Sequence, residues 1–480
     1  TDASHQHSNF RFATIGALIL YGDVPGMEKI LRDGLQYFAA QIAPYTEGEG
    51  ETEGPSYGES RLRGISWSVA ALQIAFDFPF SDLPSYKRIL RFFAELTPVG
   101  EKVCWFGDSF NDHFEYGNLY RALTIFAALG NDSELQWRAD RGQPELIAEE
   151  FSPIGDAGDW FSPPMLFHYY PRVKPTPPKN VTVTRVCYDA GFVIHHSNSF
   201  DYKKNVGFVF KCSPQGKTNH CHGDQGSFSL YAYGRVIATN TGHYHGTDGE
   251  YGSPHDKYYY KDTVSKNSLL INGFSQAHAN AKNPVEGQII AFYEDGNLTY
   301  AAGSFANTYP PEAGAIRVIR HILEVKNRYF VIFDEIIAKE PSTFTFLYHA
   351  PPPPLPPRGA TSIESFSGGR LDYTVSGLKV RFVMVTEGIE SKHEPRSIGV
   401  DGKDYTNIMK LSSNMNFQFY NKEKKSNQTF LVVIFPYFDN PPNIERIDDT
   451  HVRVEYDGTV DIIGFEPNLN KITVKTLQET

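Results

Sequence analysis

The sequence predicts an α+β multidomain protein in which a helical array or toroid precedes an antiparallel β-sandwich. Apolar residues recur at helical spacing in the first third of the chain and alternate with period two in the rest, and a proline-rich stretch separates the two patterns. The 480 residues exceed what one ordinary core accommodates, so two or three domains are expected.

The helical part is expected over residues 1–165. Apolar side chains return every three or four positions between 27 and 43. Further helices are expected at 66–76, 86–96, 119–128 and 133–149. Long loops rich in glycine and acidic residues separate them, which is typical of helical hairpins or a toroid. Because the chain begins with Thr1 rather than Met, a preceding segment that carries more helices is also expected.

The β part follows a proline-rich stretch, residues 166–180, which predicts an extended linker. An antiparallel sandwich is expected over 181–388. A C-terminal sheet is expected over 389–480, and it either stands alone or belongs to the same sandwich. Alternation of apolar and polar residues predicts strands at 181–186, 206–211, 228–238, 316–325 and 329–337.

Composition narrows the function classes. The net charge of −11 argues against a protein that coats nucleic acid or an anionic membrane, and no apolar run reaches the roughly 18 residues of a spanning helix. The four cysteines show no CxxC spacing, so they are expected to be mostly free thiols, with one or two disulfides as the alternative. They are Cys104, Cys187, Cys212 and Cys221.

The densest polar cluster combines His220, His222 and Asp224 immediately before an expected strand. Residues two apart in a strand face the same side, so the three side chains are expected to project together. Two imidazoles and a carboxylate on one face suit either a divalent metal or proton transfer. The alternative is an exposed, polar strand end.

Two further clusters lie closer to the N-terminus. His5, Gln6 and His7 precede the first expected helix, where polar residues can also serve as N-caps. Tyr57 lies on a loop that leads into a helix, and the positive charge of Arg61 would favour its phenolate form. The alternative for Tyr57 is a tyrosine that packs on the loop.

Together these clusters resemble the heparinase II/III-type polysaccharide lyases, a superfamily that includes alginate, oligoalginate and heparan lyases and a related epimerase. The resemblance implies an incomplete α/α toroid packed on an antiparallel β-sandwich, with the active cleft between them. The motifs that carry it are Glu53-Gly-Pro-Ser-Tyr57, Phe106-Gly-Asp-Ser109 and Asn219-His-Cys-His-Gly-Asp-Gln-Gly-Ser-Phe228.

The resemblance implies a catalytic role for each cluster. Tyr57 matches a tyrosine that acts as base, acid or both, and His220 matches a histidine that reaches the active site. His5 or His7 matches the residue that neutralises the substrate carboxylate. The residues expected to contact substrate are Gln6, Arg61, Tyr244 and Tyr258.

The resemblance also implies one structural divalent metal, whether zinc, manganese or calcium, with His222 as a ligand. Asn240 stands where relatives carry an aspartate, and Lys266 stands where they carry a histidine. Asn240 stays a candidate ligand, and two explanations remain open. Either the ammonium of Lys266 replaces the cation, or ligands come from the loop that begins near Gly242. The candidates in that loop are His243, His245, His255 and Asp256.

The activity that the resemblance implies is β-elimination on a polymer that contains uronic acid, which leaves unsaturated uronate ends. The segments that carry the clusters hold few basic residues, which favours unsulfated alginate over a heparin or heparan substrate. A uronate epimerase would use the same residues. An acidic polysaccharide as the partner would place the protein in the periplasm or outside the cell.

Two hypotheses of other classes compete. A glycoside hydrolase on a helical toroid needs two opposed carboxylates, and loop residues such as Asp108 and Asp112 could supply them. A non-catalytic carbohydrate-binding protein would bind saccharide without turnover. The product separates a hydrolase from a lyase, because hydrolysis leaves a saturated sugar and elimination leaves an unsaturated one.

Overall fold

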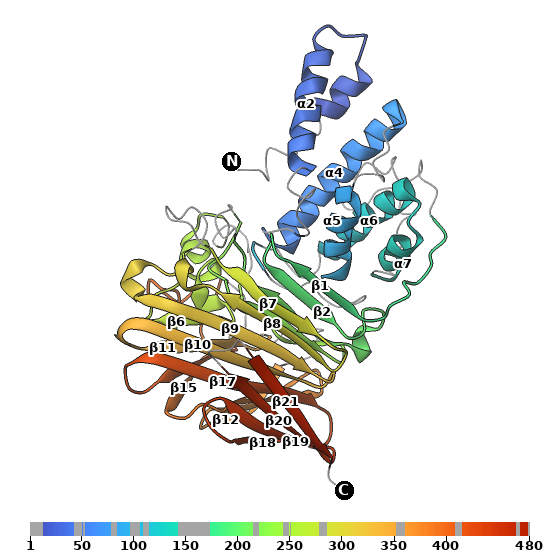
Figure 1. Ribbon diagram of the computed structural model, residues 1–480. Coiled ribbons are helices and arrows are strands. Elements are labelled where there is room, and N and C mark those ends of the chain that lie inside the picture. The colour runs from blue at the N-terminus through green and yellow to red at the C-terminus, as the bar shows by residue number, and fades with distance from the viewer. Residues whose placement is uncertain are drawn as a thin grey trace.

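Helices occupy the N-terminal part of the chain, and antiparallel sheets stacked in layers occupy the remainder (Figure 1). The computed structural model describes residues 13–42, 50, 53–77, 84–96, 106–108, 115–142, 173–214, 220–242, 249, 251–277, 286–351, 361–408, 415–466 and 471–478.

Helix α4 is the helix that matters most for the site, and it begins earlier than expected. Because it begins at Pro55, Tyr57 lies in its first turn rather than on a loop. Proline suits the first helical position, since its fixed φ is helical and its missing N–H would have no partner there. The helices are α2 (Met27–Ile42), α4 (Pro55–Phe76), α5 (Pro84–Glu95), α6 (Glu115–Gly130) and α7 (Ser133–Gly142), with a further helical segment at 13–19.

Four antiparallel sheets follow the helices. The first has the order β1-β2-β3-β4-β5, with β1 (Val183–Cys187), β2 (Phe192–His196), β3 (Val206–Lys211), β4 (Ser227–Ala232) and β5 (Arg235–Ala238). The second has the order β12-β13-β14-β17-β10-β9-β8-β7, with β12 (Thr361–Ser367), β13 (Arg370–Val375), β14 (Leu378–Met384), β17 (Lys425–Tyr437), β10 (Tyr329–Ser342), β9 (Ala315–Val325), β8 (Leu298–Ser304) and β7 (Gln288–Glu294).

The two remaining sheets have four strands each. One has the order β15-β16-β11-β6, with β15 (Ile389–Glu394), β16 (Asn416–Asn421), β11 (Phe344–His349) and β6 (Leu269–Ile271). The other has the order β18-β19-β20-β21, with β18 (Asn443–Arg446), β19 (His451–Tyr456), β20 (Thr459–Glu466) and β21 (Lys471–Gln478). Short helical turns are η2 (Tyr202–Lys204), η3 (Asp256–Tyr260), η4 (Thr263–Ser265), η5 (Ala306–Thr308) and η6 (Pro311–Ala313).

The first sheet is buried on both faces, because alternate side chains of its strands enter different cores. Phe192 and Ile194 pack against the helices, whereas Val193 between them packs toward the eight-stranded sheet. In the same way Tyr231 belongs to the helical core and Leu230 to the core between the sheets. Side chains two apart on a strand share a face. This sheet therefore joins the helical part to the β part.

The opposite face of the eight-stranded sheet packs on the C-terminal sheet. Val331 and Phe333 of β10 share a core with Val452 of β19 and Phe465 of β20. Residues 389–480 are thus divided. Strands β15, β16 and β17 join sheets that the preceding strands build, and β18 to β21 form a sheet of their own (Figure 1).

The antiparallel β part is confirmed, and the incomplete α/α toroid stays a prediction. One detail of the strand prediction was wrong, because residues 228–238 form the hairpin of β4 and β5 rather than one strand. Tyr233 (φ 49°) and Gly234 (φ 77°) both adopt the left-handed conformation that a tight hairpin turn requires. Glycine reaches that conformation without steric cost, so Gly234 was the signal in the sequence.

Three of the four cysteines lie in the described residues, where they are buried and form no disulfide with one another: Cys187, Cys212 and Cys221. Cys104 lies outside those residues. None of the helices in the described part combines the length and the apolar character that crossing a bilayer requires.

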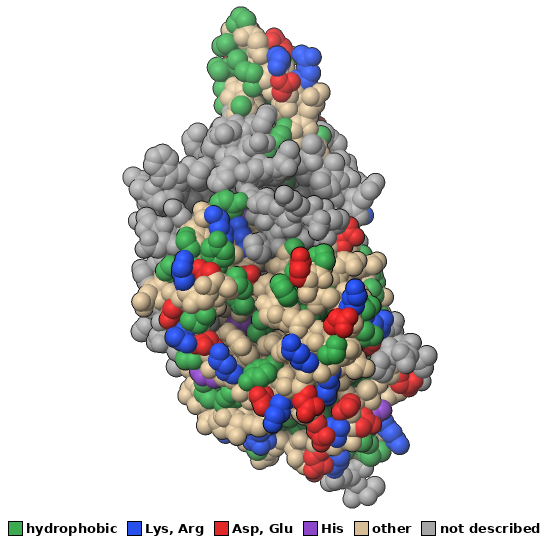
Figure 2. Space-filling model, turned by 90° about the vertical axis from the view of Figure 1, so that its left-hand side faces the viewer, with side chains coloured by type: hydrophobic (Ala, Val, Ile, Leu, Met, Phe, Trp, Pro, Cys, Tyr) green, Lys and Arg blue, Asp and Glu red, His purple; other side chains and the backbone are tan. Residues whose placement is uncertain are grey.

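The surface of the β-rich part mixes both signs of charge. On the face shown in Figure 2, Lys and Arg side chains are interspersed with Asp and Glu side chains below the helices. Apolar side chains are visible at the helical tip at the top of the same view. The exposed large apolar residues of the segment 13–42 are Ile19, Leu20, Tyr21, Val24 and Ile30.

Candidate active site

A buried carboxylate, Asp108, connects the two motif histidines. Its Oδ2 accepts a hydrogen bond from Nδ1 of His220 (2.5 Å), and its Oδ1 accepts one from Nε2 of His222 (2.7 Å). All three side chains are almost fully buried. The two histidines therefore meet at one carboxylate, and Asp108 fixes the orientation of both rings.

Asp224, the third member of the predicted cluster, does not join the histidines. Its carboxylate accepts two hydrogen bonds from the buried ammonium of Lys211, at 2.8 and 3.0 Å. The expectation that alternation would project all three side chains together was wrong for this residue. Strand β4 begins only at Ser227, so residues 220–224 lack the period-two geometry of a strand.

The protonation states follow from this geometry. Burial raises the pKa of Asp108, but the hydrogen bonds from His220 and His222 and the charge of Lys261 outweigh burial and hold that pKa well below its ordinary value. Asp108 is therefore ionised at neutral pH and can only accept hydrogen bonds. It follows that Nδ1 of His220 carries a proton, and in the neutral ring the other nitrogen, Nε2, is the basic one.

His222 differs from His220 in its surroundings. Burial, and then the charge of Lys266, hold the pKa of His222 well below its ordinary value. The ring is therefore neutral, with its proton on the Nε2 that donates to Asp108. Its Nδ1 has no hydrogen-bond partner among the described residues. His222 thus acts as a neutral support for Asp108.

Tyr57 meets His220 face to face. The ring centroids are 3.4 Å apart, and the ring planes differ by 14°. Helix α4 places Tyr57 at the end that reaches the β-rich part (Figure 1). A phenol and an imidazole in contact form a pair in which both side chains can give or take a proton.

Lys261 and Tyr251 complete the surroundings of His220, and no motif in the sequence singled them out. The ammonium of Lys261 lies 3.3 Å from Asp108 Oδ2 and 3.4 Å from Asp256 Oδ2. It also lies 4.0 Å from the centroid of the Tyr251 ring, which meets His220 edge to face at 5.8 Å. Tyr251 is 47% exposed, so this aromatic side chain lies where the site opens to solvent.

Two glycines bring the segment of Asp108 against the start of α4. Gly54 (φ 96°) lies so close to Phe106 that a Cβ would collide with the Phe106 carbonyl oxygen. Gly107 (φ 71°) lies equally close to the carbonyl of Glu53. The Tyr260 hydroxyl donates to the Gly107 carbonyl (3.2 Å), which holds the segment from its other side. Only glycine permits this approach of two backbones.

We expect Gly54→Ala to destabilise the protein by about 2–4 kcal/mol and to reduce activity with it, because the new Cβ forces Phe106 and Asp108 away from His220. Urea denaturation and an activity assay measure both effects. Gly273→Ala is the matched control, since Gly273 has φ 76° but a Cβ added there would meet no atom within 4 Å. It should cost only the about 1–2 kcal/mol of a left-handed alanine and leave activity unchanged. Equal effects of the two substitutions would contradict the close packing at Gly54.

The described residues do not fit the divalent metal that the resemblance implies. Within them no group of three or more His, Cys, Asp or Glu side chains is placed to hold a metal ion. Asn240 Oδ1 accepts a hydrogen bond from the Asn267 N–H (3.0 Å), and its Nδ2 donates to Ser227 Oγ (3.4 Å). Both amide atoms of the candidate ligand Asn240 therefore serve the fold.

The alternative ligands in the loop do not complete a metal site either. His255 is buried and stacks on Tyr260, with ring centroids 6.0 Å apart, and Asp256 binds Lys261. His243 and His245 lie outside the described residues. A zinc ion usually takes at least three protein ligands, and the described part of the chain offers no such set.

Several predicted site residues lie outside the described residues. They are His5, Gln6, His7, Tyr244 and the side chain of Arg61, and their roles stay predictions. Tyr258 is 41% exposed on η3, whereas Tyr260 of the same turn is buried against His222, with ring centroids 4.7 Å apart. The role of Tyr258 in binding substrate stays a prediction too.

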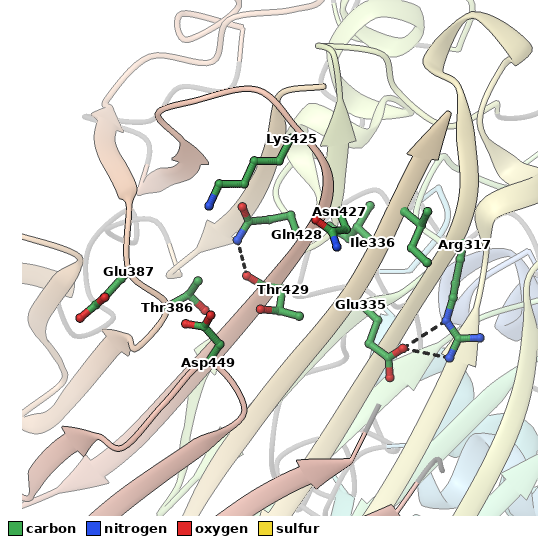
Figure 3. Close-up of a pocket in the computed structure, with 11 residues that line it drawn as sticks. Arg317, Glu335, Ile336, Thr386, Glu387, Lys425, Asn427, Gln428, Thr429 and Asp449 are labelled. Carbon is green, nitrogen blue, oxygen red and sulfur yellow. Dashed lines mark hydrogen bonds and ion pairs between the residues drawn. The ribbon is translucent and has the colours of Figure 1, made fainter. Parts of the chain in front are cut away.

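A separate pocket of about 500 Å³ lies on the β-sandwich and contains none of the predicted site residues (Figure 3). Arg317 donates two hydrogen bonds to Glu335 across one side of it, and Gln428 donates to the Thr429 carbonyl. These polar groups bind one another, and the pocket is separate from the stacked rings of Tyr57 and His220.

The comparisons with known proteins agree with this fold. A family model for the C-terminal domain described as heparinase II/III-like matches residues 184–461. No curated protein sequence matches the chain.

Solved structures share the arrangement at low sequence identity. The chain is similar to a heparinase III gene product (15% identity, TM-score 0.67), with 99% of this chain and 66% of that chain covered. It is similar to the heparan sulfate lyase HepC from Pedobacter heparinus (14% identity, TM-score 0.68), with 98% and 66% covered. A structure of heparinase III shares 14% identity at a TM-score of 0.63 and is covered to 67%. The chain thus spans about two thirds of the length of these proteins, and the likeness establishes a shared fold.

Proposed function

The chain belongs to the heparinase II/III-like family, and from this membership we propose that it is a polysaccharide lyase that cleaves a uronic-acid-containing polymer by β-elimination. The observation that carries the proposal is the stacked pair of Tyr57 and His220, with His220 oriented by the buried Asp108. This pair supplies two proton-transfer groups side by side, which is what elimination requires.

Elimination needs one proton removed and one delivered. A base takes the proton from C5 of the uronate, and the electron pair of the broken C5–H bond forms the C4–C5 double bond. The C4–O4 bond then breaks, and an acid protonates the leaving O4. Tyr57 and His220 share these two tasks, and the epimer bound decides which of them faces the C5 proton. An unperturbed tyrosine has a pKa of about 10 and is a poor base at neutral pH, whereas an imidazole whose Nδ1 donates to a carboxylate has Nε2 as its second proton-transfer atom.

The carboxylate of the substrate must also be neutralised so that its α-proton becomes acidic. We assign this task to His5 or His7, with Gln6 beside it, on the basis of the sequence resemblance. Arg61 is the candidate for holding a further carboxylate, since guanidinium binds carboxylates with two hydrogen bonds.

The polymer itself is the finer part of the proposal. Two solved structures that share this fold are named as heparan sulfate lyase and heparinase III, so a heparan-type substrate fits at least as well as alginate. We therefore propose that heparan sulfate and alginate are both tested as substrates. A polymeric substrate is met outside the cytoplasm, and we propose secretion or a periplasmic location on that ground.

A hydrolase is a weaker candidate, because Asp108 is already occupied. Its carboxylate accepts hydrogen bonds from two histidines and lies 3.3 Å from an ammonium group. Its pKa is lowered, whereas the general acid of a glycosidase needs a raised one.

Incubation with a panel of uronans tests the proposal. Heparan sulfate, alginate and unsulfated chondroitin are supplied separately, and ultraviolet absorbance of the unsaturated product is followed together with chain length. We expect at least one polymer to be shortened with a matching rise in absorbance. Shortening without absorbance would indicate a hydrolase, a change of epimer without shortening would indicate an epimerase, and binding without any product would indicate a carbohydrate-binding protein. Each of these three outcomes would contradict the proposal.

A further inference from the structure

The buried carboxylates near His222 are bound by other side chains of the chain itself. Asp108 accepts hydrogen bonds from His220 and His222, and Asp224 accepts two from Lys211. Both buried carboxylates are therefore bound by protein donors. A metal would have to displace these donors, and breaking a buried ion pair is strongly destabilising.

Lys266 is held firmly beside the residues that the resemblance marks as ligands. Its neighbour Ser265 accepts a hydrogen bond through its carbonyl from the Thr241 N–H (2.8 Å), and its other neighbour, Asn267, donates its N–H to Asn240 (3.0 Å). Lys266 is only 2% exposed. The backbone on both sides thus fixes the position from which the ammonium group projects.

The ammonium of Lys266 and the ring of His222 share one neighbour. The Lys266 Nζ lies 5.1 Å from the centroid of the Tyr260 ring, and His222 meets the same ring at 4.7 Å. An ammonium over an aromatic face is stabilised by the ring quadrupole. Burial lowers the pKa of Lys266 to about 7, although the charges of Asp224 and Asp108 act in the opposite direction, so its amino group is partly protonated at neutral pH. The same buried region therefore holds this amino group, a neutral imidazole and the carboxylates of Asp108 and Asp224.

From these contacts we propose that this chain folds without the divalent metal that the resemblance implies, and that the buried amino group of Lys266 takes the place of that metal. A divalent cation would compete with this amino group for the same buried space and would meet a like charge whenever the group is protonated. The side chain carries its own charge to the site and needs no ligand set, which leaves Asn240 to bind the backbone. The inference rests on the family resemblance and the geometry, and it is independent of the proposed activity.

The first test is the metal content and thermal unfolding of the purified protein, with EDTA and with added zinc chloride. We expect far less than one metal ion per chain and a Tm that neither reagent changes. One metal ion per chain together with a lower Tm in EDTA would overturn the proposal. Neither readout needs substrate, so a failure here is distinct from a failure of the proposed lyase activity.

The second test restores the ligand types that the chain has lost. The double variant Asn240→Asp, Lys266→His is expected to take up about one zinc ion per chain, and its Tm is expected to rise by about 2 °C or more with zinc. The control Lys266→Met removes the ammonium without adding a ligand. Burial disfavours the charged form of Lys266, so this control should be at least as stable as the unsubstituted protein, and zinc should not change its Tm.

Two outcomes would contradict the role of Lys266. A double variant that folds but binds no zinc would show that Lys266 does not occupy the metal position. Uptake of about one zinc ion per chain by Lys266→Met would show that the remaining side chains hold a metal without a restored ligand, and this result stays decisive even if the double variant fails to fold.

Discussion

Tyr57→Phe is expected to keep the fold and to lower the rate of unsaturated-product formation by about 10²–10⁴-fold, the range that one general acid or base contributes. The change removes only the hydroxyl and preserves the ring that stacks on His220 at 3.4 Å. The loss should therefore appear in kcat, with KM and Tm nearly unchanged. Steady-state kinetics on the polymer identified in the panel measures it, and product absorbance within threefold of the unsubstituted enzyme would contradict the role of Tyr57.

A second tyrosine–histidine pair provides the matched control for this experiment. The Tyr300 hydroxyl and His321 Nδ1 are 2.8 Å apart in the β-sandwich, and their rings lie nearly parallel. Tyr300→Phe should cost about 1 kcal/mol of stability through the lost hydrogen bond and leave kcat unchanged. If both substitutions lowered kcat alike, the effect of Tyr57→Phe would be structural.

Asp108→Asn is expected to lower kcat by about 10²–10⁴-fold, because an amide cannot accept hydrogen bonds from two N–H groups on opposite atoms. The new NH₂ group would face either His220 or His222. Where the NH₂ group faces His220, Nδ1 of the ring must accept a hydrogen bond instead of donating one. The ring proton then lies on Nε2. The pair with Tyr57 thereby loses its base, although the side chain keeps its shape.

The control must separate this effect from a loss of buried charge. Asp224→Asn removes the partner of Lys211 but touches neither histidine. Both variants should unfold at lower temperature, whereas kcat measured well below that temperature should fall strongly only for Asp108→Asn. An Asp108→Asn enzyme with nearly full kcat, or equal kcat losses in the two variants, would contradict the positioning role of Asp108.

Acid should destabilise the protein through the same carboxylate. The folded-state pKa of Asp108 is lowered, so its contribution to stability is fully present above the ordinary pKa of an aspartate and is lost as pH falls through the folded value. Asp108→Asn removes this contribution at every pH. The difference in stability between the two proteins should therefore shrink toward strongly acidic pH.

The fold was predictable where periodicity is local. The strand at Val206–Lys211 matches its predicted bounds. It is a short run rich in valine and phenylalanine that is buried on both faces, and such a run can be recognised from the sequence alone. The start of α4 was missed, since Glu53 to Arg61 lacks an apolar stripe and only Pro55 marks the first turn. The hairpin at 228–238 was missed as well, because its turn is only two residues long, although Gly234 marks it in the sequence.

The candidate site was predictable only in its residue types. The spacing of His220 and His222 already implied one shared face, and the resemblance singled out Tyr57. Asp108 was assigned to an acidic loop that could serve a hydrolase, yet it lies between two histidines that are 112 and 114 positions further along the chain. No periodicity connects residues so far apart.

The sequence by itself determined the order of helices and strands, the family and the chemical groups available for proton transfer. The tertiary structure decided which of these groups meet. In the folded chain Asp108 accepts hydrogen bonds from both histidines, and Asp224 accepts hydrogen bonds from Lys211. The amino group of Lys266 lies beside the ring of Tyr260. The physical reason is that a buried charge is costly unless another group pairs with it. The pairing groups come from segments far apart in the sequence, which only the packing of the folded chain brings together.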